Sequence, residues 1–147
     1  DCVSQGVIAP VAETPFDFRA PKYIGKDIDA DNEQIHRAHG YDHCFCIDGY
    51  TPHGEPRLAL LASGTKAELT ILLTTPGAHF YTGNWLGDIN AKDGAVYGPN
   101  DGFAFEPEFY PDFIHHPAWS QSCCDADHPY IESIVYRIRP REEPMRS

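Results

Sequence analysis

Turn-forming residues interrupt this sequence so often that long regular elements are excluded. Thirteen prolines and twelve glycines are spread over its 147 residues, and each proline removes a backbone N–H donor from any helix or central strand. The stretches between them are short, and several alternate between apolar and polar residues, as half-buried strands do. The sequence therefore predicts an all-β chain with many turns, in which antiparallel sheets stack face to face as a β-sandwich.

The clearest strand signal lies at 66–75, where apolar residues recur at every second position from Ala67 to Leu73. This segment follows 57–63 after Ser63-Gly64-Thr65, so the two segments are expected to form a hairpin. A short helix is expected only at 32–39. The other expected strands are 41–48, 78–85, 102–106 and 130–138, with 17–19 as a short extended piece and Pro107 ending the strand before it.

The domain organisation predicted from the sequence is simple. Residues 1–138 are expected to form part of a single domain, and 139–147 a charged, disordered tail that contains two prolines. Two connections, at 21–40 and 86–101, are long for a compact domain. Long connections are usually functional loops, and they also arise where further sequence completes a sheet.

The charge of the chain limits its partners. The formal net charge is −11, which disfavours binding to nucleic acid or anionic lipid, because both need clustered lysine and arginine. No apolar run approaches the roughly 20 residues that span a bilayer. No signal-peptide pattern is visible, and the expected location is the cytoplasm. A neutral small molecule such as a monosaccharide is compatible with this charge, whereas no oligomeric state is predicted.

A group of potential metal ligands lies at 36–46. His36, His39, His43, Cys44 and Cys46 are all of ligand type, but their spacing matches no standard zinc pattern and no second ligand pair follows. Neighbouring side chains on a strand also face opposite ways. Neither a metal nor a cofactor is therefore expected.

Two segments combine polar with aromatic side chains, namely GYDH at 40–43 and FAFEPEFYPD at 103–112. On a strand, Phe103 and Phe105 share one face, and Glu106 faces the other side. A carboxylate among aromatic residues is suited to proton transfer. The residues alone nevertheless favour the simpler interpretation, which is an exposed carboxylate at the end of a strand.

Five segments, taken in order, resemble those of the aldose 1-epimerase (galactose mutarotase) family. Each segment is short, and it is their common order over most of the chain that makes the resemblance specific. The matching segments are TPFDFR at 14–19 with Ile24-Gly25, GYDH at 40–43, TPG at 75–77 with FYTGN at 80–84, the stretch from Gly102 through Glu106 to Pro117, and a closing strand with Tyr130 and Tyr136.

The resemblance implies a large antiparallel β-sandwich of the galactose mutarotase type. It also implies interconversion of the α and β anomers of free aldohexoses, such as galactose or glucose, without a cofactor. In the family, a glutamate takes the proton of the C1 hydroxyl and a histidine protonates the ring oxygen. Carried over by position, Glu106 is the catalytic base, Asp42 binds sugar hydroxyls, and His43 supports Asp42 in substrate binding.

The resemblance covers the C-terminal part of the family. The acid histidine of the family, a second histidine and a substrate-binding arginine precede the segments matched here, so the chain is expected to be inactive on its own. Histidines at 36, 39, 79, 115 and 116 occupy none of those motif positions. Pro107-Glu108 also replaces the small residue and glutamine that usually follow the catalytic glutamate.

Two other functions are compatible with the same resemblance. One is a non-catalytic sugar-binding or regulatory domain of the same superfamily, which the missing acid histidine favours. The other is a hexose-6-phosphate 1-epimerase. The acidic charge of the chain and its lack of a clustered Arg/Lys phosphate clamp disfavour this last function.

Overall fold

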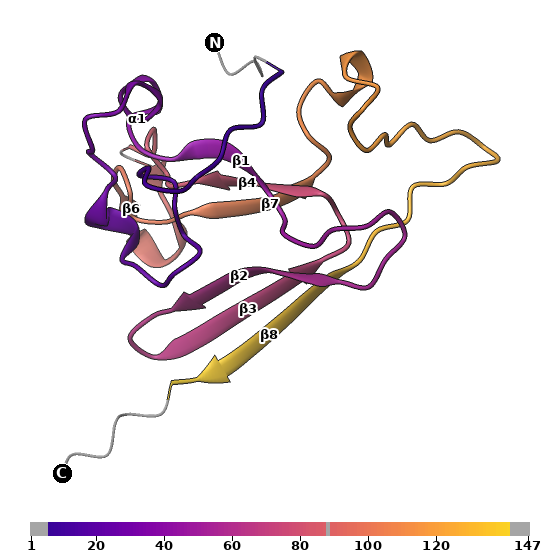
Figure 1. Ribbon diagram of the computed structural model, residues 1–147. Coiled ribbons are helices and arrows are strands. Elements are labelled where there is room, and N and C mark those ends of the chain that lie inside the picture. Colours follow the sequence, from indigo (N-terminus) through magenta and orange to yellow (C-terminus); the bar gives the residue numbers. More distant parts are fainter. Residues whose placement is uncertain (1–5, 88, 142–147) are drawn as a thin grey trace. The chain divides into compact units, whose positions relative to one another are not determined.

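The computed structural model describes residues 6–87 and 89–141 and consists mainly of strands (Figure 1). The prediction of an all-β chain with antiparallel sheets is confirmed. The elements, in chain order, are η1 (Ile24–Lys26), α1 (Glu33–Ala38), β1 (Asp42–Cys46), β2 (Arg57–Ser63), β3 (Ala67–Leu73), β4 (Gly77–Tyr81), β5 (Ile89–Asn90), η2 (Lys92–Gly94), β6 (Val96–Tyr97), β7 (Ala104–Glu108), η3 (Phe113–His115) and β8 (Ile134–Pro140).

The chain divides into two compact units. Unit 1 comprises Asp1–Cys44 and His79–Glu106, and unit 2 comprises Phe45–Ala78 and Pro107–Ser147. Both units are therefore assembled from two stretches that are distant in sequence. Strands β1, β4 and β7 form a three-stranded sheet.

In unit 2, β2, β3 and β8 form an antiparallel sheet with β3 in the centre. The Gly64 N–H donates to Ala67 O at 2.8 Å and closes the predicted hairpin. Leu60 and Tyr136 lie on either side of Ile71 in the register. Ile71 and Leu73 are buried, with 3% and 0% exposure. The strand expected at 66–75 is thus confirmed as Ala67–Leu73, and its burial alternates from Ile71 to Leu73.

Strand β8 begins and ends later than the sequence indicated. It runs to Pro140, two residues beyond the predicted end, and Arg139 pairs with Glu68 of β3. A proline is tolerated there because β8 is at the edge of this sheet, where one side of the strand needs no ladder donor. Of the segment expected to be a disordered tail, 142–147 lies outside the described residues.

In the other three-stranded sheet, β4 lies between β1 and β7, and all neighbours are distant in sequence (Figure 1). The expectation that Pro107 ends its strand is wrong, because β7 continues through Pro107 to Glu108. Strand β7 is an edge strand of this sheet, so the N–H that proline lacks is not needed on the outer side. Glu106 is therefore inside the strand rather than at its end.

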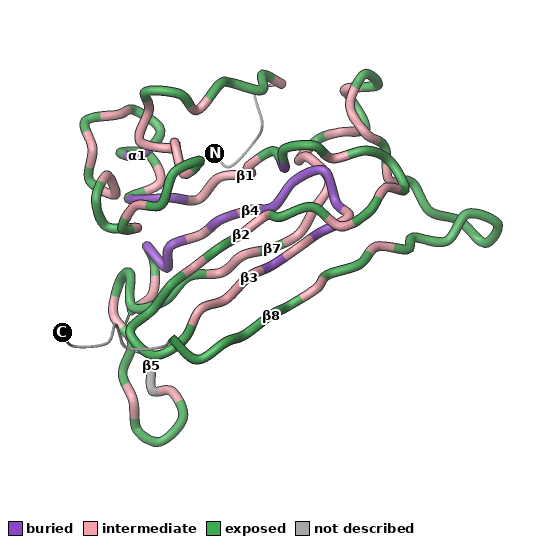
Figure 2. The backbone as a smooth tube through the Cα atoms, turned by 60° about the horizontal axis from the view of Figure 1, so that its bottom comes forward, coloured by how far each residue is buried: buried purple, intermediate pink, exposed green. Residues whose placement is uncertain are grey.

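Burial is concentrated on β4 and the residues that follow it (Figure 2). Ala78 and Phe80 of β4 are 0% and 6% exposed, and Thr82 is 2% exposed. Strand β8 is mostly exposed in the same view, including Tyr136 at 58%. The best-packed part of the described chain is thus the strand that supplies the FYTGN segment.

The two ends of the segment that contains β2 and β3 meet in unit 2. The Ile47 N–H, directly after β1, donates to Pro76 O, directly before β4, at 2.8 Å. Ile47 is 8% exposed, so this hydrogen bond is shielded from water. A backbone hydrogen bond therefore joins the two ends of the segment that contains the β2–β3 hairpin.

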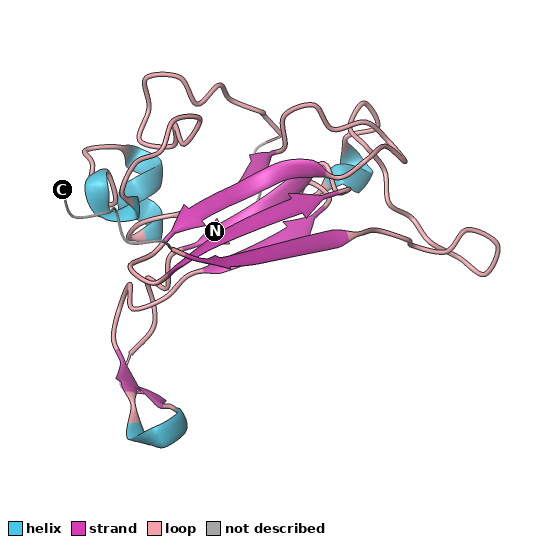
Figure 3. Ribbon diagram, turned by 90° about the horizontal axis from the view of Figure 1, so that it is seen from below, coloured by secondary structure: helices cyan, strands magenta, loops and turns pink. Residues whose placement is uncertain are grey.

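The predicted helix at 32–39 is confirmed as α1. The Asn32 side chain caps its first turn by accepting from the N–H groups of Gln34 and Ile35. His39, with φ 56°, ends the helix in the left-handed conformation. The long connection 86–101 contains a short β5–β6 hairpin with η2 at its tip (Figure 3). No helix among residues 6–87 and 89–141 is long and apolar enough to cross a membrane.

Candidate functional site

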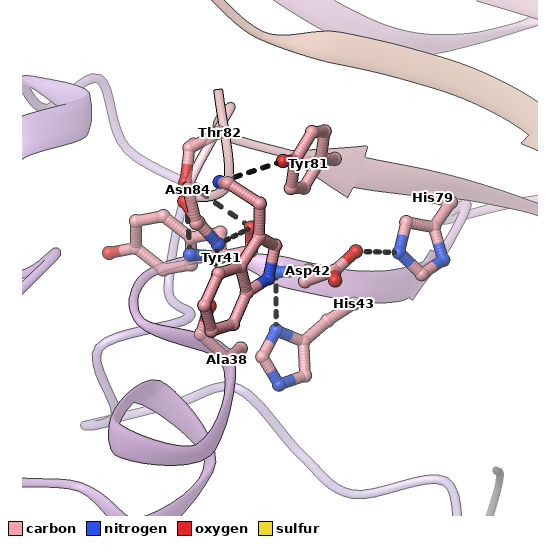
Figure 4. A network of polar contacts seen from close by, with 9 residues as sticks. Ala38, Tyr41, Asp42, His43, His79, Tyr81, Thr82 and Asn84 are labelled. Carbon is pink, nitrogen blue, oxygen red and sulfur yellow. Dashed lines mark hydrogen bonds and ion pairs between the residues drawn. The ribbon is translucent and has the colours of Figure 1, made fainter. Parts of the chain in front are cut away.

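Hydrogen bonds join the GYDH and FYTGN segments within unit 1 (Figure 4). The Tyr41 N–H donates to Thr82 Oγ1 at 3.0 Å, and the Thr82 N–H donates to Tyr41 O at 3.0 Å. The Asn84 side-chain amide donates to Tyr41 O at 2.9 Å and to Ala38 O at 2.8 Å. These buried bonds fix the start of β1 beside the end of β4, and with it the position of Asp42.

Gly40 is required by this arrangement. Its φ is 134°, a backbone conformation that side chains disfavour. A Cβ atom at this position would also lie 2.6 Å from Asn84 Oδ1. The glycine of GYDH therefore allows the Asn84 amide to reach the Tyr41 carbonyl directly before β1.

Aromatic side chains gather on one side of β1 and β4. Tyr41 is fully buried, its hydroxyl donates to Pro15 O at 2.9 Å, and burial raises its pKa to about 12. The TPFDFR segment contributes two rings, because Phe16 and Phe18 lie 5.8 and 5.1 Å from the Tyr41 ring. The members of this aromatic cluster are Phe16, Phe18, Tyr41, Phe80 and Phe103.

The opposite side of the same strands carries polar groups. Side chains alternate along a strand, so Asp42 faces away from Tyr41, and His79 faces away from Phe80. Asp42 Oδ1 and His79 Nε2 are 2.7 Å apart (Figure 4). Both side chains are about a quarter exposed, at 23% and 24%. The structure thus brings the predicted Asp42 together with a histidine that the motif comparison passed over.

His43 is held in the neutral form on the aromatic side. The Asp42 N–H donates to His43 Nδ1 at 2.9 Å, and the Phe16 ring lies 4.7 Å from the imidazole. Burial lowers the pKa of His43, and the positive charge that His79 carries when protonated lowers it further, against the opposing effect of the Asp42 carboxylate. A ring nitrogen that accepts a hydrogen bond carries no proton, so His43 acts here as a support for the backbone of β1.

Glu106 lies on β7, the neighbour of β4, and is exposed. Phe103, just before β7, contacts Phe80 at 5.7 Å on the aromatic side. Phe103 and Phe105 share a face by alternation, so Glu106 faces the side of His79. Asp42, His79 and Glu106 therefore lie on three adjacent strands and face the same side of the sheet; we call this side the polar face.

His79 was missed by sequence reasoning because it matches no histidine position of the family motifs. A signal was nevertheless present. His79 interrupts the apolar segment at 78–80 and lies two residues from Tyr81, at a position where a half-buried strand exposes its polar face. Pairing with Asp42 depends on the β1–β4 register, which local pattern does not specify.

A separate pocket of about 330 Å³ lies in unit 1 and contains none of Asp42, His43 and Glu106. Its residues are Ile24, Gly25, Ile28, Thr82, Asn100, Asp101, Gly102 and Phe103. Within residues 6–87 and 89–141, no three His, Cys, Asp or Glu side chains are arranged to hold a metal ion. The polar face thus presents carboxylate and imidazole groups outside this pocket.

The model of the family described as aldose 1-epimerase matches residues 1–136. The chain belongs to the aldose 1-epimerase family. It is 38% identical to the galactose mutarotase of Homo sapiens over 117 residues, which are 78% of this chain and 32% of that protein. It is 35% identical to the aldose 1-epimerase of Escherichia coli (strain K12) over 114 residues, 78% of this chain and 33% of that protein.

Solved structures of the family share this fold. The GalM/aldose epimerase homologue from C. elegans matches with a TM-score of 0.73 and 28% identity, covering 95% of this chain and 41% of that one. The galactose 1-epimerase from Lactobacillus acidophilus NCFM matches with a TM-score of 0.65 and 26% identity, covering 91% and 37%. The chain spans about a third of the length of the curated relatives it matches.

Proposed function

We propose that this chain is the part of an aldose 1-epimerase that carries the catalytic base, and that the whole protein interconverts the α and β anomers of a free aldohexose such as galactose or glucose. The observation that supports this most is the polar face of the β1–β4–β7 sheet. It presents two carboxylates, Asp42 and Glu106, on one side of a sheet whose other side is aromatic. Family membership adds the reaction class.

Glu106 is the proposed base. Its carboxylate takes the proton of the C1 hydroxyl, while an acid donates a proton to the ring oxygen as the C1–O5 bond breaks. The electron pair of the O–H bond forms the second bond of the C1 carbonyl, and the pair of the broken C1–O5 bond goes to the ring oxygen. Rotation about C1–C2 followed by reclosure returns both protons and gives either anomer. The exposed position of Glu106 on an edge strand is compatible with access by a sugar.

Asp42 is the proposed anchor for sugar hydroxyls. An ionised carboxylate has about four sites that accept hydrogen bonds, so the bond from His79 leaves capacity for hydroxyl donors. His43 supports this anchor by accepting from the Asp42 N–H on the other side of the strand. A fixed carboxylate of this kind contributes orientation, which intramolecular proton transfer needs.

Polarimetry of galactose mutarotation by the complete protein tests the proposal. Replacing Glu106 by Gln keeps the shape of the side chain and removes the base, so kcat is expected to fall by about 10²- to 10⁴-fold. Glu68→Gln on β3 is the matched control and should keep the activity of the unsubstituted protein. Undiminished turnover in the Glu106→Gln protein would sink the assignment of the base.

Polarimetry and calorimetry together separate the alternative functions. Sugar binding measured by calorimetry in a protein that produces no mutarotation would replace the enzyme by a sugar-binding or regulatory domain. Turnover of glucose 6-phosphate in preference to free glucose would indicate a hexose-6-phosphate 1-epimerase. Faster turnover of free galactose or glucose would support the function proposed above.

A further inference from the structure

We propose that Asp93-Gly94 is a site of spontaneous covalent modification, at which aspartate rearranges to isoaspartate; this inference is independent of the proposed function. Three aspartates in the chain are followed directly by glycine, at positions 48, 93 and 101. Aspartates before glycine are the most prone to this reaction, because glycine has no side chain that shields its backbone nitrogen. The structure separates Asp93 from the other two.

The rearrangement consumes only water that it has itself released. The backbone nitrogen of Gly94 attacks the carboxyl carbon of Asp93, and a C–N bond forms. The carboxyl group, in its protonated form, loses its hydroxyl, which leaves together with the amide proton as one water molecule. Water then opens the five-membered succinimide ring at either carbonyl. Opening at one carbonyl restores aspartate, and opening at the other leaves the main chain running through the side-chain carboxyl carbon.

Asp93 lies in η2, at the tip of the β5–β6 hairpin (Figure 3). Lys92, Asp93 and Gly94 are all exposed, so water reaches both the carboxylate and the ring that forms from it. A Cβ atom added to Gly94 would meet nothing within 4 Å. The tip of the hairpin therefore has room for the succinimide ring.

The backbone at this tip is strained and is held by few contacts. Asp93 has φ 58° and ψ 24°, in the left-handed region that residues other than glycine disfavour. Gly94 N can reach the carboxyl carbon only after ψ of Asp93 rotates, so the turn must open first. In the described part of the chain, β5 and β6 form a sheet of two strands joined by two residue pairs. Two-stranded ribbons are marginally stable in water, so this opening is local and frequent.

Asp101 is exposed as well, but hydrogen bonds hold its turn closed. The Gly98 N–H donates to Asp101 Oδ2 at 2.7 Å, and the Asp101 N–H donates to Gly98 O at 3.3 Å. The side-chain amide of the preceding Asn100 donates to O of the buried Thr82 at 2.9 Å. These bonds must break before the Asp101 carboxyl carbon can turn toward the next backbone nitrogen, which slows the reaction there.

Asp48-Gly49 lies in a turn that is anchored to the protein interior. The Tyr50 N–H donates to Ile47 O at 3.2 Å, and Ile47 is only 8% exposed, so opening this turn brings an apolar side chain into water. The Arg57 side chain lies 3.7 Å from the position of an added Cβ at Gly49. Because the space beside the glycine is partly filled, Asp48 is also expected to react more slowly than Asp93.

Incubation of the complete protein for several weeks at neutral pH and physiological temperature tests the ranking. Peptide mass spectrometry with electron-transfer fragmentation distinguishes isoaspartate from aspartate of equal mass. Transfer of a labelled methyl group from S-adenosylmethionine by an isoaspartyl carboxyl methyltransferase measures the total. Isoaspartate at position 93 is expected to exceed that at 48 or 101 about five- to thirtyfold. Equal amounts at the three positions, or a larger amount at 48 or 101, overturn the inference.

The same incubation in urea separates the fold from the local sequence. In the unfolded chain the three aspartates should react at rates of the same order, because no turn then restrains them. A ranking that survives unfolding would mean that the flanking residues produce it, and the structural inference would be wrong.

Substitutions at the hairpin tip supply the remaining controls. Asp93→Glu requires a six-membered ring and should lose the signal at this position. Gly94→Ala shields the attacking nitrogen and should reduce the signal at 93. The matched control is Gly102→Ala, where an added Cβ also meets nothing within 4 Å, and it should leave isoaspartate at 93 unchanged. A signal assigned to position 93 that persists in Asp93→Glu would overturn the assignment of the site.

Discussion

The two three-stranded sheets differ in what holds their strands together. In β2–β3–β8, a tight hairpin and buried aliphatic residues such as Ile71 and Leu73 join neighbouring strands. In β1–β4–β7, no two neighbours are consecutive in sequence, and side-chain hydrogen bonds from Thr82 and Asn84 to the backbone of Tyr41 fix the start of β1. The first sheet is thus held by local pairing and aliphatic burial, and the second by buried aromatic residues together with polar contacts that also position Asp42.

The largest effect on stability is expected in the β2–β3–β8 sheet. Leu73→Ala removes a side chain that is 0% exposed and should lower the free energy of unfolding by about 2–5 kcal/mol. Urea denaturation measures this loss. Leu61→Ala on the adjacent strand, where the leucine is 61% exposed, is the matched control, and an equal loss in both would contradict the assignment of the core. The turnover number of folded Leu73→Ala protein should not change.

Gly40→Ala tests the contacts that fix β1 in the β1–β4–β7 sheet. The alanine Cβ would lie 2.6 Å from Asn84 Oδ1 at a φ of 134°, so stability should fall by about 2–4 kcal/mol. Mutarotation by the folded protein should fall too, because Asp42 lies two residues away. Gly25→Ala, where an added Cβ meets nothing within 4 Å, should leave both quantities unchanged. Unchanged stability in Gly40→Ala would show that the Asn84 contact is dispensable.

A smaller loss is expected for Thr82→Val, which keeps the shape of the side chain and removes the hydroxyl. The Tyr41 N–H loses its side-chain partner, and Asn84 Oδ1 keeps only the bond from the Asn100 amide, which costs about 1–3 kcal/mol in a buried site. Thr70→Val, at a half-buried position of β3, is the control in the other sheet. Thermal unfolding of the pair should rank Thr82→Val as the less stable protein.

The smallest effect near neutral pH concerns Tyr41→Phe, which removes the hydrogen bond to Pro15 and should cost about 1 kcal/mol. At high pH, the raised pKa of Tyr41 determines whether stability rises or falls with pH. The unfolded phenol ionises near 10.0 and the folded one near 12, so the unfolded state releases its proton first, and stability falls between these values. Ultraviolet titration should lose its most basic phenol in Tyr41→Phe and keep it in Tyr23→Phe.

The sequence predicted the β2–β3–β8 sheet better than the β1–β4–β7 sheet. Alternation at 66–75 and the Ser63-Gly64-Thr65 turn were enough to define β2 and β3, because hairpin pairing is local. The sequence prediction ended this strand before Pro107, whereas β7 continues to Glu108. A proline ends a strand only where both sides of the strand need backbone donors, and the local sequence does not show whether a strand lies at the edge of a sheet. The family resemblance identified Asp42 and Glu106 as candidates, whereas His79 required the β1–β4 register.

The hydrogen bond between Ile47 and Pro76 has a consequence for how this family can vary. Because both ends of the β2–β3 segment meet there, residues can be inserted or deleted in the hairpin turn without separating β1 from β4. Loop-closure entropy changes only slowly with loop length, so such changes cost little. Length differences among relatives should therefore gather at the exposed turns around 51–55 and 63–66.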